Sequence, residues 1–217
     1  MTYKEFVIIL KQIKINESDK LLTLLGEKKG RFVAIVKGAQ RPTSKKTSII
    51  DIGAEFSAMF AKGKNIDLLV DAKRIGYLSN INNSLIKSAL LFYILELADK
   101  FFIDASRAYK SFTLLKQTLN TLNKLSENDL IDKRFLLAFL VNILTLEGIL
   151  DENILDSKNK KIIKFIQKYE LIDILKLKLE NSNINNLTNI LQKQIDNFLH
   201  TKLKSKEYLF NILVNHN

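Results

Sequence analysis

Residues 55–73 read EFSAMFAKGKNIDLLVDAK. Apolar side chains occupy every second position on either side of Gly63, with Phe56 and Phe60 in the first half and Leu68 and Val70 in the second. Period-two alternation is typical of strands with one buried face, and the segment 63–65, Gly-Lys-Asn, supplies turn residues between them. We therefore predict a hairpin of two antiparallel strands over residues 55–60 and 66–73.

Three further strands are predicted before this hairpin, near residues 4–15, 20–25 and 31–37. The last two are joined by a turn that begins at Gly26 and ends at Gly30. Five short strands in about 75 residues suit a small closed barrel, and the five-stranded oligonucleotide-binding (OB) barrel is a common solution that removes exposed edges. We expect antiparallel pairing throughout.

Glycines mark a change of class along the chain. Six of the seven lie between Gly26 and Gly76, together with the single proline, and the last is Gly148. Long helices exclude both residue types, so the chain should become helical near residue 80. The predicted fold class is α+β: an OB-type barrel domain over residues 1–79, followed by an all-α helical domain over residues 80–217.

Helical periodicity supports the second half of this division. Three helices are predicted around residues 85–97, 112–122 and 135–146, the first capped by Ser84 and the third ended by Gly148. Further helices are expected near residues 158–168, 170–179, 184–200 and 205–214.

Basic residues are concentrated between residues 28 and 50, KKGRFVAIVKGAQRPTSKKTSII, which hold seven Lys or Arg and no Asp or Glu. The whole chain has a formal net charge of +11. A basic strand-and-loop surface suits a nucleic-acid binder, because each cation that neutralises a phosphate releases condensed counterions. The competing interpretation is an ordinary solvated loop. The predicted DNA-binding residues are Lys28, Lys29, Arg31, Lys37, Arg41, Lys45 and Lys46.

Catalytic and metal-binding patterns are missing from the sequence. There are no cysteines, only two histidines far apart, and no phosphate-binding loop of the GxxxxGK type. Phe32, Phe56 and Phe60 are candidates for base stacking, but their alternation favours a place in the barrel core. We expect no enzyme activity, no metal and no cofactor. No signal-type leader or membrane-length apolar run is found, so we expect a soluble cytoplasmic protein.

Short motifs occur in a characteristic order along nearly the whole chain. They are Asn16-Glu17-Ser18-Asp19, Leu24, Gly30-Arg31, Val36-Lys37-Gly38-Ala39, Arg41, Ser44, Glu96-Leu97, Lys133-Arg134-Phe135 and Leu203-Lys204-Ser205-Lys206-Glu207. This order resembles that of the RecO family of bacterial recombination mediators, most specifically in the KGA segment at 37–39 and the LKS segment at 203–205.

The resemblance implies a protein that binds single- and double-stranded DNA through its barrel and anneals complementary strands. It also implies pairing with RecR and help in loading RecA on DNA coated by single-stranded DNA-binding protein. Members of the family with cysteines carry a zinc module, whereas residues 151–161 here offer only acidic ligands. We therefore expect that module to be lost or degenerate.

A second surface is implied for the acidic, aromatic-ended tail of single-stranded DNA-binding protein. Such a tail needs basic residues around an apolar pocket. The residues predicted to bind it are Lys133, Arg134, Lys202, Lys204 and Lys206. The competing interpretation is that these are solvated charges at helix starts.

Two other functions stay open at this point. One is a helical scaffold or adaptor whose barrel is structural and whose DNA binding is incidental to its charge. The other is an RNA-binding barrel. Salt dependence distinguishes a phosphate binder from an adaptor, and competition between DNA and RNA separates the two nucleic acids.

Overall fold

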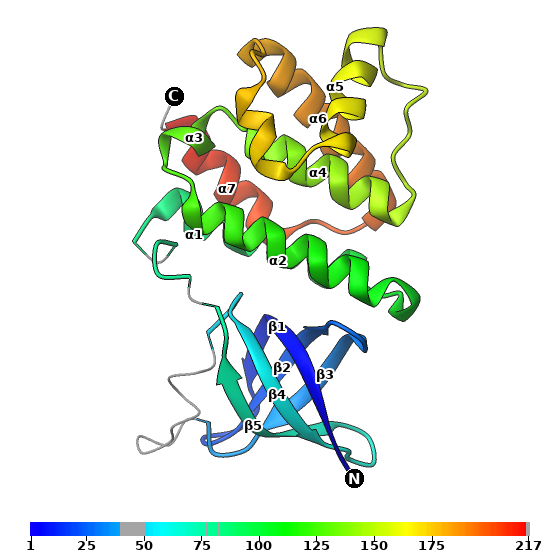
Figure 1. The fold of residues 1–217 in the computed structure, drawn as a ribbon. Helices are drawn as coiled ribbons and strands as arrows, with labels where there is room; N and C mark the ends of the chain where they lie inside the picture. The colour runs from blue at the N-terminus through cyan, green and yellow to red at the C-terminus, as the bar shows by residue number, and fades with distance from the viewer. Residues whose placement is uncertain (40–50, 77, 82, 216–217) are drawn as a thin grey trace. The chain divides into compact units, whose positions relative to one another are not determined.

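The computed structural model describes residues 1–39, 51–76, 78–81 and 83–215. Its amino-terminal part is a closed barrel of five strands (Figure 1). The strands are β1 (Thr2–Lys14), β2 (Lys20–Gly26), β3 (Gly30–Val36), β4 (Glu55–Ala61) and β5 (Asp67–Arg74). The predicted OB-type barrel followed by helices is confirmed. The expectation of antiparallel pairing throughout is wrong for one pair, because β5 closes against β3 in parallel.

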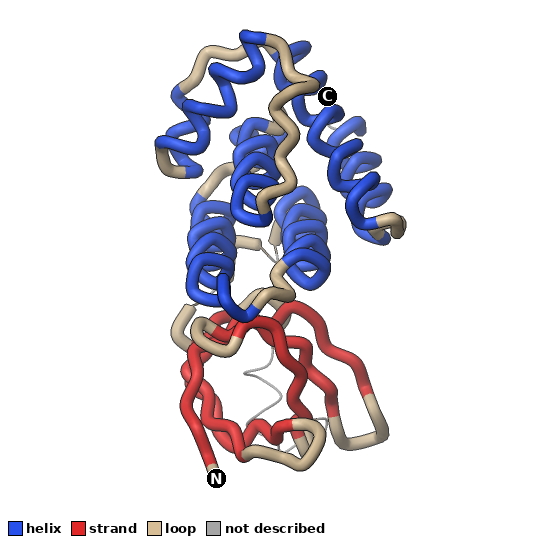
Figure 2. The backbone as a smooth tube through the Cα atoms, turned by 90° about the vertical axis from the view of Figure 1, so that its right-hand side faces the viewer, coloured by secondary structure: helices blue, strands red, loops and turns tan. Residues whose placement is uncertain are grey.

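The barrel closes because β1 is long enough to pair with two neighbours. Its second half pairs with β2 and its first half with β4. The register shifts between Ile9 and Lys11, an irregularity of the kind that bends a strand and raises its twist. The bend lets the sheet return on itself, and the strands surround the barrel interior (Figure 2).

Inward-facing residues of the strands form the barrel core. Phe32, Phe56 and Phe60 are at most 9% exposed and belong to this core, so the alternation in the sequence assigned them correctly. Phe60 stacks on Tyr3 and meets Phe32 edge-on. Three buried rings leave no stacking platform for nucleic acid on this side of the sheet.

The predicted alternation fails in β5. Leu69 is buried in the core, whereas Val70 is 43% exposed, although the sequence pattern had placed Leu68 and Val70 on one face. The pairing explains the difference, because Met59 pairs with Asp71 and Phe60 with Leu69. Val70 is the extra residue of a bulge, and it changes the face of every residue before it.

The chain divides into two compact units. One contains Met1–Ser79 and Leu95–Lys116, and the other contains Asn80–Ile94 and Gln117–Asn217. The expected domains, 1–79 and 80–217, stay a prediction. In the first unit, the barrel is accompanied by the end of α1 (Leu85–Phe101), the 3-10 helix η1 (Ala105–Arg107) and the first half of α2 (Ala108–Lys124).

The second unit is built around α4 (Arg134–Glu147), which packs against α5, α6 and the 3-10 helix η2. Nearly every side chain of α4 from Phe135 to Leu144 is buried, and Gly148 ends the helix in the left-handed conformation, with φ of 72°, as predicted. The other helices of this unit are α3 (Asn128–Ile131), α5 (Ser157–Lys168), η2 (Leu171–Lys176), α6 (Asn181–Leu199) and α7 (Lys204–Asn215).

One predicted helix is shorter than expected. Residues 170–179 form only the 3-10 helix η2, which ends at Lys176. Glu170 and Asp173 make a reciprocal capping box at its start, so local side-chain bonds favour a short turn there. The predicted cap of α1 is confirmed, because the Lys87 N–H donates to Ser84 Oγ at 3.2 Å.

Candidate nucleic-acid interface

The turn between β2 and β3 presents the first two predicted cations. Lys28 and Lys29 are both exposed there. The buried carboxylate of Glu5 accepts the backbone N–H groups of both residues, at 2.6 Å and 3.1 Å. A side chain at Gly26 would collide with this carboxylate, since a Cβ there would lie 2.8 Å from Glu5 Oε1. The turn is therefore held in one conformation by an acid from β1.

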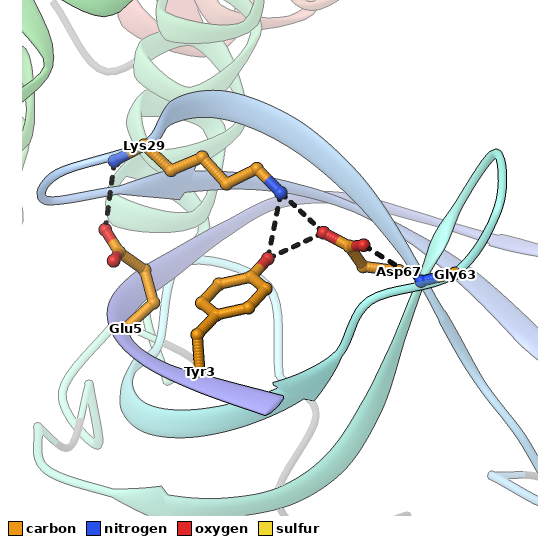
Figure 3. A network of polar contacts seen from close by, with 5 residues as sticks. All are labelled: Tyr3, Glu5, Lys29, Gly63 and Asp67. Atoms are coloured by element: carbon orange, nitrogen blue, oxygen red, sulfur yellow. Dashed lines mark hydrogen bonds and ion pairs between the residues drawn. The ribbon is translucent and has the colours of Figure 1, made fainter. Parts of the chain in front are cut away.

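Lys29 takes part in a network of polar contacts that joins three parts of the barrel (Figure 3). Its Nζ lies 2.5 Å from Asp67 Oδ2 and 2.9 Å from the Tyr3 hydroxyl, which itself donates to Asp67 at 2.7 Å. The same ammonium stands over the rings of Tyr3 and Phe32, at 4.9 Å and 4.5 Å from their centroids. The charge of Lys29 therefore already faces a carboxylate and two aromatic rings at the barrel surface.

The carboxylate of Asp67 is the acidic centre of this network. The hydrogen bond from Lys29 and then that from Tyr3 lower the pKa of Asp67 below its ordinary value. Asp67 Oδ1 also accepts the Gly63 N–H at 3.3 Å, which ties in the loop between β4 and β5. Residues from β1, the β2–β3 turn and β5 thus meet at one end of the barrel.

Arg31 and Lys37 lie at opposite ends of β3. Arg31 Nε donates to Asp99 Oδ1 of α1 at 2.7 Å, and its side chain keeps one third of its surface exposed. Lys37 is exposed, and it precedes Gly38, whose N–H donates to Asp19 Oδ1 at 2.8 Å. Within the part of the chain that the structure describes, Lys28 and Lys37 make no ion pair, whereas Lys29 and Arg31 do.

The remaining predicted DNA contacts, Arg41, Lys45 and Lys46, lie outside the described residues. Of the four that are described, Lys28 and Lys29 share one turn, and Arg31 is the second residue of β3 after Gly30. Lys37 is separated from Arg31 by about 20 Å of strand, at roughly 3.3 Å per residue. The fold spreads these cations along β3, which matches an extended backbone better than a single phosphate.

Two of the residues predicted to bind the partner tail, Arg134 and Lys133, make contacts within the helical part of the chain. Arg134 donates through Nη1 to the carbonyls of Leu175 and Leu177, at 2.5 Å and 3.0 Å, and pairs with Asp132. Its guanidinium therefore fastens the end of η2 to the start of α4. Lys133 has the left-handed conformation, with φ of 64°, and donates to Asn185 Oδ1 at 2.9 Å. Burial lowers the pKa of Lys133.

A pocket of about 740 Å³ lies where α6 ends and α7 begins. It is lined by Asp196, His200, Thr201, Lys202, Leu203, Lys206, Glu207, Phe210 and Asn211. Lys202 and Lys204 are exposed, and Lys206 Nζ pairs with Asp196 at 2.6 Å. Lys133 Nζ stands 5.8 Å from the ring of Phe210. Of the predicted cations, Lys202 and Lys206 line this pocket, and Lys133 approaches it only through Phe210. Lys204 is not among the lining residues, and Arg134 is engaged with η2.

The carboxylates that bond to the predicted cations and to their turn could not be identified from the sequence, because they are far from them along the chain. Asp67 and Asp99 lie 38 and 68 residues from their basic partners, and Glu5 lies more than 20 residues from the turn that it supports. Over the described residues, no group of three or more Asp, Glu or His is placed to hold a metal ion. Among the same residues, no helix combines the length and apolarity needed to cross a membrane.

Comparison with known proteins agrees with the barrel. Residues 1–78 match the family model described as Recombination protein O N terminal. A protein of Syntrophomonas wolfei named DNA repair protein RecO is 26% identical, over 66% of this chain and 57% of its own length. Proteins of the same name from Dehalococcoides mccartyi and Desulforamulus reducens are 31% and 25% identical, over 64% and 95% of this chain.

These similarities differ in how much of each relative they include. The chain spans 57%, 58% and 55% of the length of the first three relatives, which is less than two thirds. The match to the Desulforamulus reducens protein spans 93% of that relative. The family model thus covers the barrel, and the match to the Desulforamulus reducens protein covers 95% of this chain at 25% identity.

Proposed function

We infer that the chain belongs to the RecO family of DNA repair proteins, and from this premise we propose that its barrel binds the phosphate backbone of DNA and promotes annealing of complementary strands. The proposed action is electrostatic. Cations on the barrel lower the repulsion between two strands, and base pairing then supplies the sequence match. No nucleotide hydrolysis and no bond-making step is required.

The observation that supports this proposal most is the pair of exposed lysines at the two ends of β3. Lys28 is presented by a turn that Glu5 holds, and Lys37 sits where β3 ends. Neither makes an ion pair among the described residues. The charge of Lys28 is therefore available to a phosphate, whereas that of Lys37 is partly offset by Asp19, whose pKa it helps to lower. A preformed and unneutralised cation loses little on binding, whereas Lys29 and Arg31 must first leave a carboxylate.

The test is the salt dependence of binding to a labelled single-stranded oligonucleotide. Each true phosphate contact contributes about −0.7 to the slope of log K against log salt on single strands. Lys28→Ala and Lys37→Ala should each reduce the slope by roughly that amount and slow annealing. Lys164→Ala, which removes an exposed charge from α5, is the matched control and should leave the slope unchanged.

The adaptor function predicts a different result. If neither barrel variant changes the slope or the annealing rate more than the α5 control, the barrel is not the DNA site. Competition with an RNA oligonucleotide of the same sequence separates DNA from RNA binding in the same assay.

We also propose that the pocket at the start of α7 binds the acidic tail of single-stranded DNA-binding protein. Lys202 supplies an exposed cation for the tail carboxylates, and Lys206 supplies a second one by exchanging its bond to Asp196 for a bond to the tail. Phe210 and Leu203 supply an apolar wall. Lys133 supports this site through its position over Phe210. RecR and, indirectly, RecA complete the proposed partners through the family relationship alone.

A further inference from the structure

The corner between α1 and α2 exposes an aromatic ring to solvent. Tyr109, the second residue of α2, is 66% exposed, the largest exposed fraction of any aromatic residue that the structure describes. Ile103 on the same corner is also 66% exposed. Because most of the Tyr109 side chain is open to solvent, its ring is available for contact with another molecule.

This corner packs directly on the start of β3. A Cβ built at Gly30 would lie 3.1 Å from Ala105 Cα and 3.6 Å from Ala108 Cβ, so only glycine permits this approach. The ion pair between Arg31 and Asp99 fastens the end of α1 to the same strand. Tyr109 follows Ala108 in the chain, so its backbone lies close to the start of β3, within one compact unit.

Several basic residues near Tyr109 in the sequence make no ion pair among the described residues. Lys100 and Lys110 are two of them, and both are exposed. Asp99 pairs with Arg31, and Asp104 pairs with Arg107 at 3.6 Å. Glu27, in the adjoining β2–β3 turn, is half-buried. Lys28 adds a third available cation from the adjoining turn.

We propose that Tyr109 is a stacking platform for an unpaired base of single-stranded DNA, whose phosphates are bound by Lys28 and Lys110. This inference rests on the proposed DNA binding by the barrel and extends that site onto the helical corner. An exposed ring beside available cations is the combination that single-strand binders use, because every base has a flat face that can stack. A duplex presents only base edges in its grooves, so the platform distinguishes single strands from duplex.

The chain contains no tryptophan, which gives a direct probe of stacking. Tyr109→Trp introduces a single indole at the proposed platform. Titration with oligothymidine should quench its emission and saturate at the concentration where fluorescence anisotropy of a labelled oligonucleotide saturates. Tyr169→Trp places the probe at a position of 47% exposure in the other compact unit and should show no such quenching. Binding by anisotropy without quenching of the Tyr109→Trp probe overturns the proposal.

Affinity measurements supply the second test. Tyr109→Ala should weaken single-strand binding by about five-fold to a hundred-fold, the range expected for losing one stacked base. Tyr109→Phe should retain parental affinity, and duplex affinity should be unchanged in both variants. An equal loss on single strands and duplex would show a general disturbance of the barrel and overturn the stacking role.

The outcomes separate this inference from the function on which it rests. A parent protein that binds DNA, together with an unaffected Tyr109→Ala variant, removes the platform and leaves the barrel as the DNA site. A parent protein that does not bind DNA removes both. Unchanged DNA binding combined with loss of a protein partner in Tyr109→Ala would assign the corner to protein contact instead.

Discussion

Replacing Asp67 with Asn tests whether the network around Lys29 stabilises the barrel. The substitution keeps the size of the side chain and an acceptor for Tyr3, but it removes the charge that faces Lys29. A hydrogen bond to a charged group contributes about 1.5–3 kcal/mol, and an exposed ion pair about 0–1 kcal/mol. Asp67 is 13% exposed and Lys29 is 39% exposed, so the pair falls between these cases. We expect the free energy of unfolding to fall by about 1.5 kcal/mol at pH 7.

The effect should depend on pH with a definite sign. The pKa of Asp67 is lowered in the folded protein, chiefly by the hydrogen bond from Lys29. A carboxyl of this kind contributes stability that is fully present above its unfolded pKa, about 3.9, and is lost as the pH falls through the lower folded value. The difference in unfolding free energy between parent and variant should therefore begin to shrink as the pH falls below about 4, and it should vanish below the folded pKa of Asp67.

Urea unfolding followed by circular dichroism measures both quantities. The matched control is Asp71→Asn, which removes an exposed charge from the same strand at a residue that makes no ion pair among those described. Surface changes of that kind usually stay within about 0.5 kcal/mol. If Asp67→Asn is no more destabilising than Asp71→Asn at pH 7, or if its effect is as large at pH 3 as at pH 7, the network does not stabilise the barrel through its charge.

Two other predictions concern the turn that Glu5 supports and the pocket at the start of α7. Glu5→Ala should speed amide hydrogen exchange at Lys28 and Lys29 by roughly tenfold, because both N–H groups lose their acceptor. Exchange at Val33, in the middle of β3, should stay as in the parent. Equal exchange at Lys28 and Lys29 in parent and variant would contradict the role of Glu5 in holding the turn. Lys206→Glu should abolish binding of a synthetic acidic, aromatic-ended peptide and preserve annealing of naked DNA. Lys164→Glu makes the same charge change on α5 and should retain both activities. Loss of annealing with retained peptide binding would reverse the assignment of the two surfaces.

The strands could be predicted from the sequence because each has one face in the barrel core. Alternation located all five within a few residues of their observed limits and assigned Phe32, Phe56 and Phe60 to the core. It failed at Val70, because a bulge inserts a residue without changing the composition of the strand. Nothing in a single sequence shows which residue of an apolar run will be the extra one.

The helices could be located more easily than their buried faces. In α1 twelve of the seventeen residues are apolar, Leu85 and Phe92 among them, so the periodic signal that would mark the buried face is weak. These two are 55% and 47% exposed, whereas Ile86 and Tyr93 are buried. The hydroxyl of Tyr93 donates to Gln192 Oε1 at 2.8 Å, a contact 99 residues away. Such a long-range partner decides which face turns inward, and it is set by tertiary packing rather than by local pattern.

The predicted interface shows the same limit for charge. A count of basic residues treats every cation as available, but availability depends on carboxylates and carbonyls that only the fold brings near. Lys29 and Arg31 meet Asp67 and Asp99 across the barrel and α1, and Arg134 is engaged by two carbonyls. The salt slope should therefore show fewer contacts than the seven basic residues between 28 and 50 suggest. The most informative cations are those that the fold leaves exposed and outside any ion pair among the described residues, which makes Lys28 and Lys37 better first targets for mutation than Lys29 or Arg31.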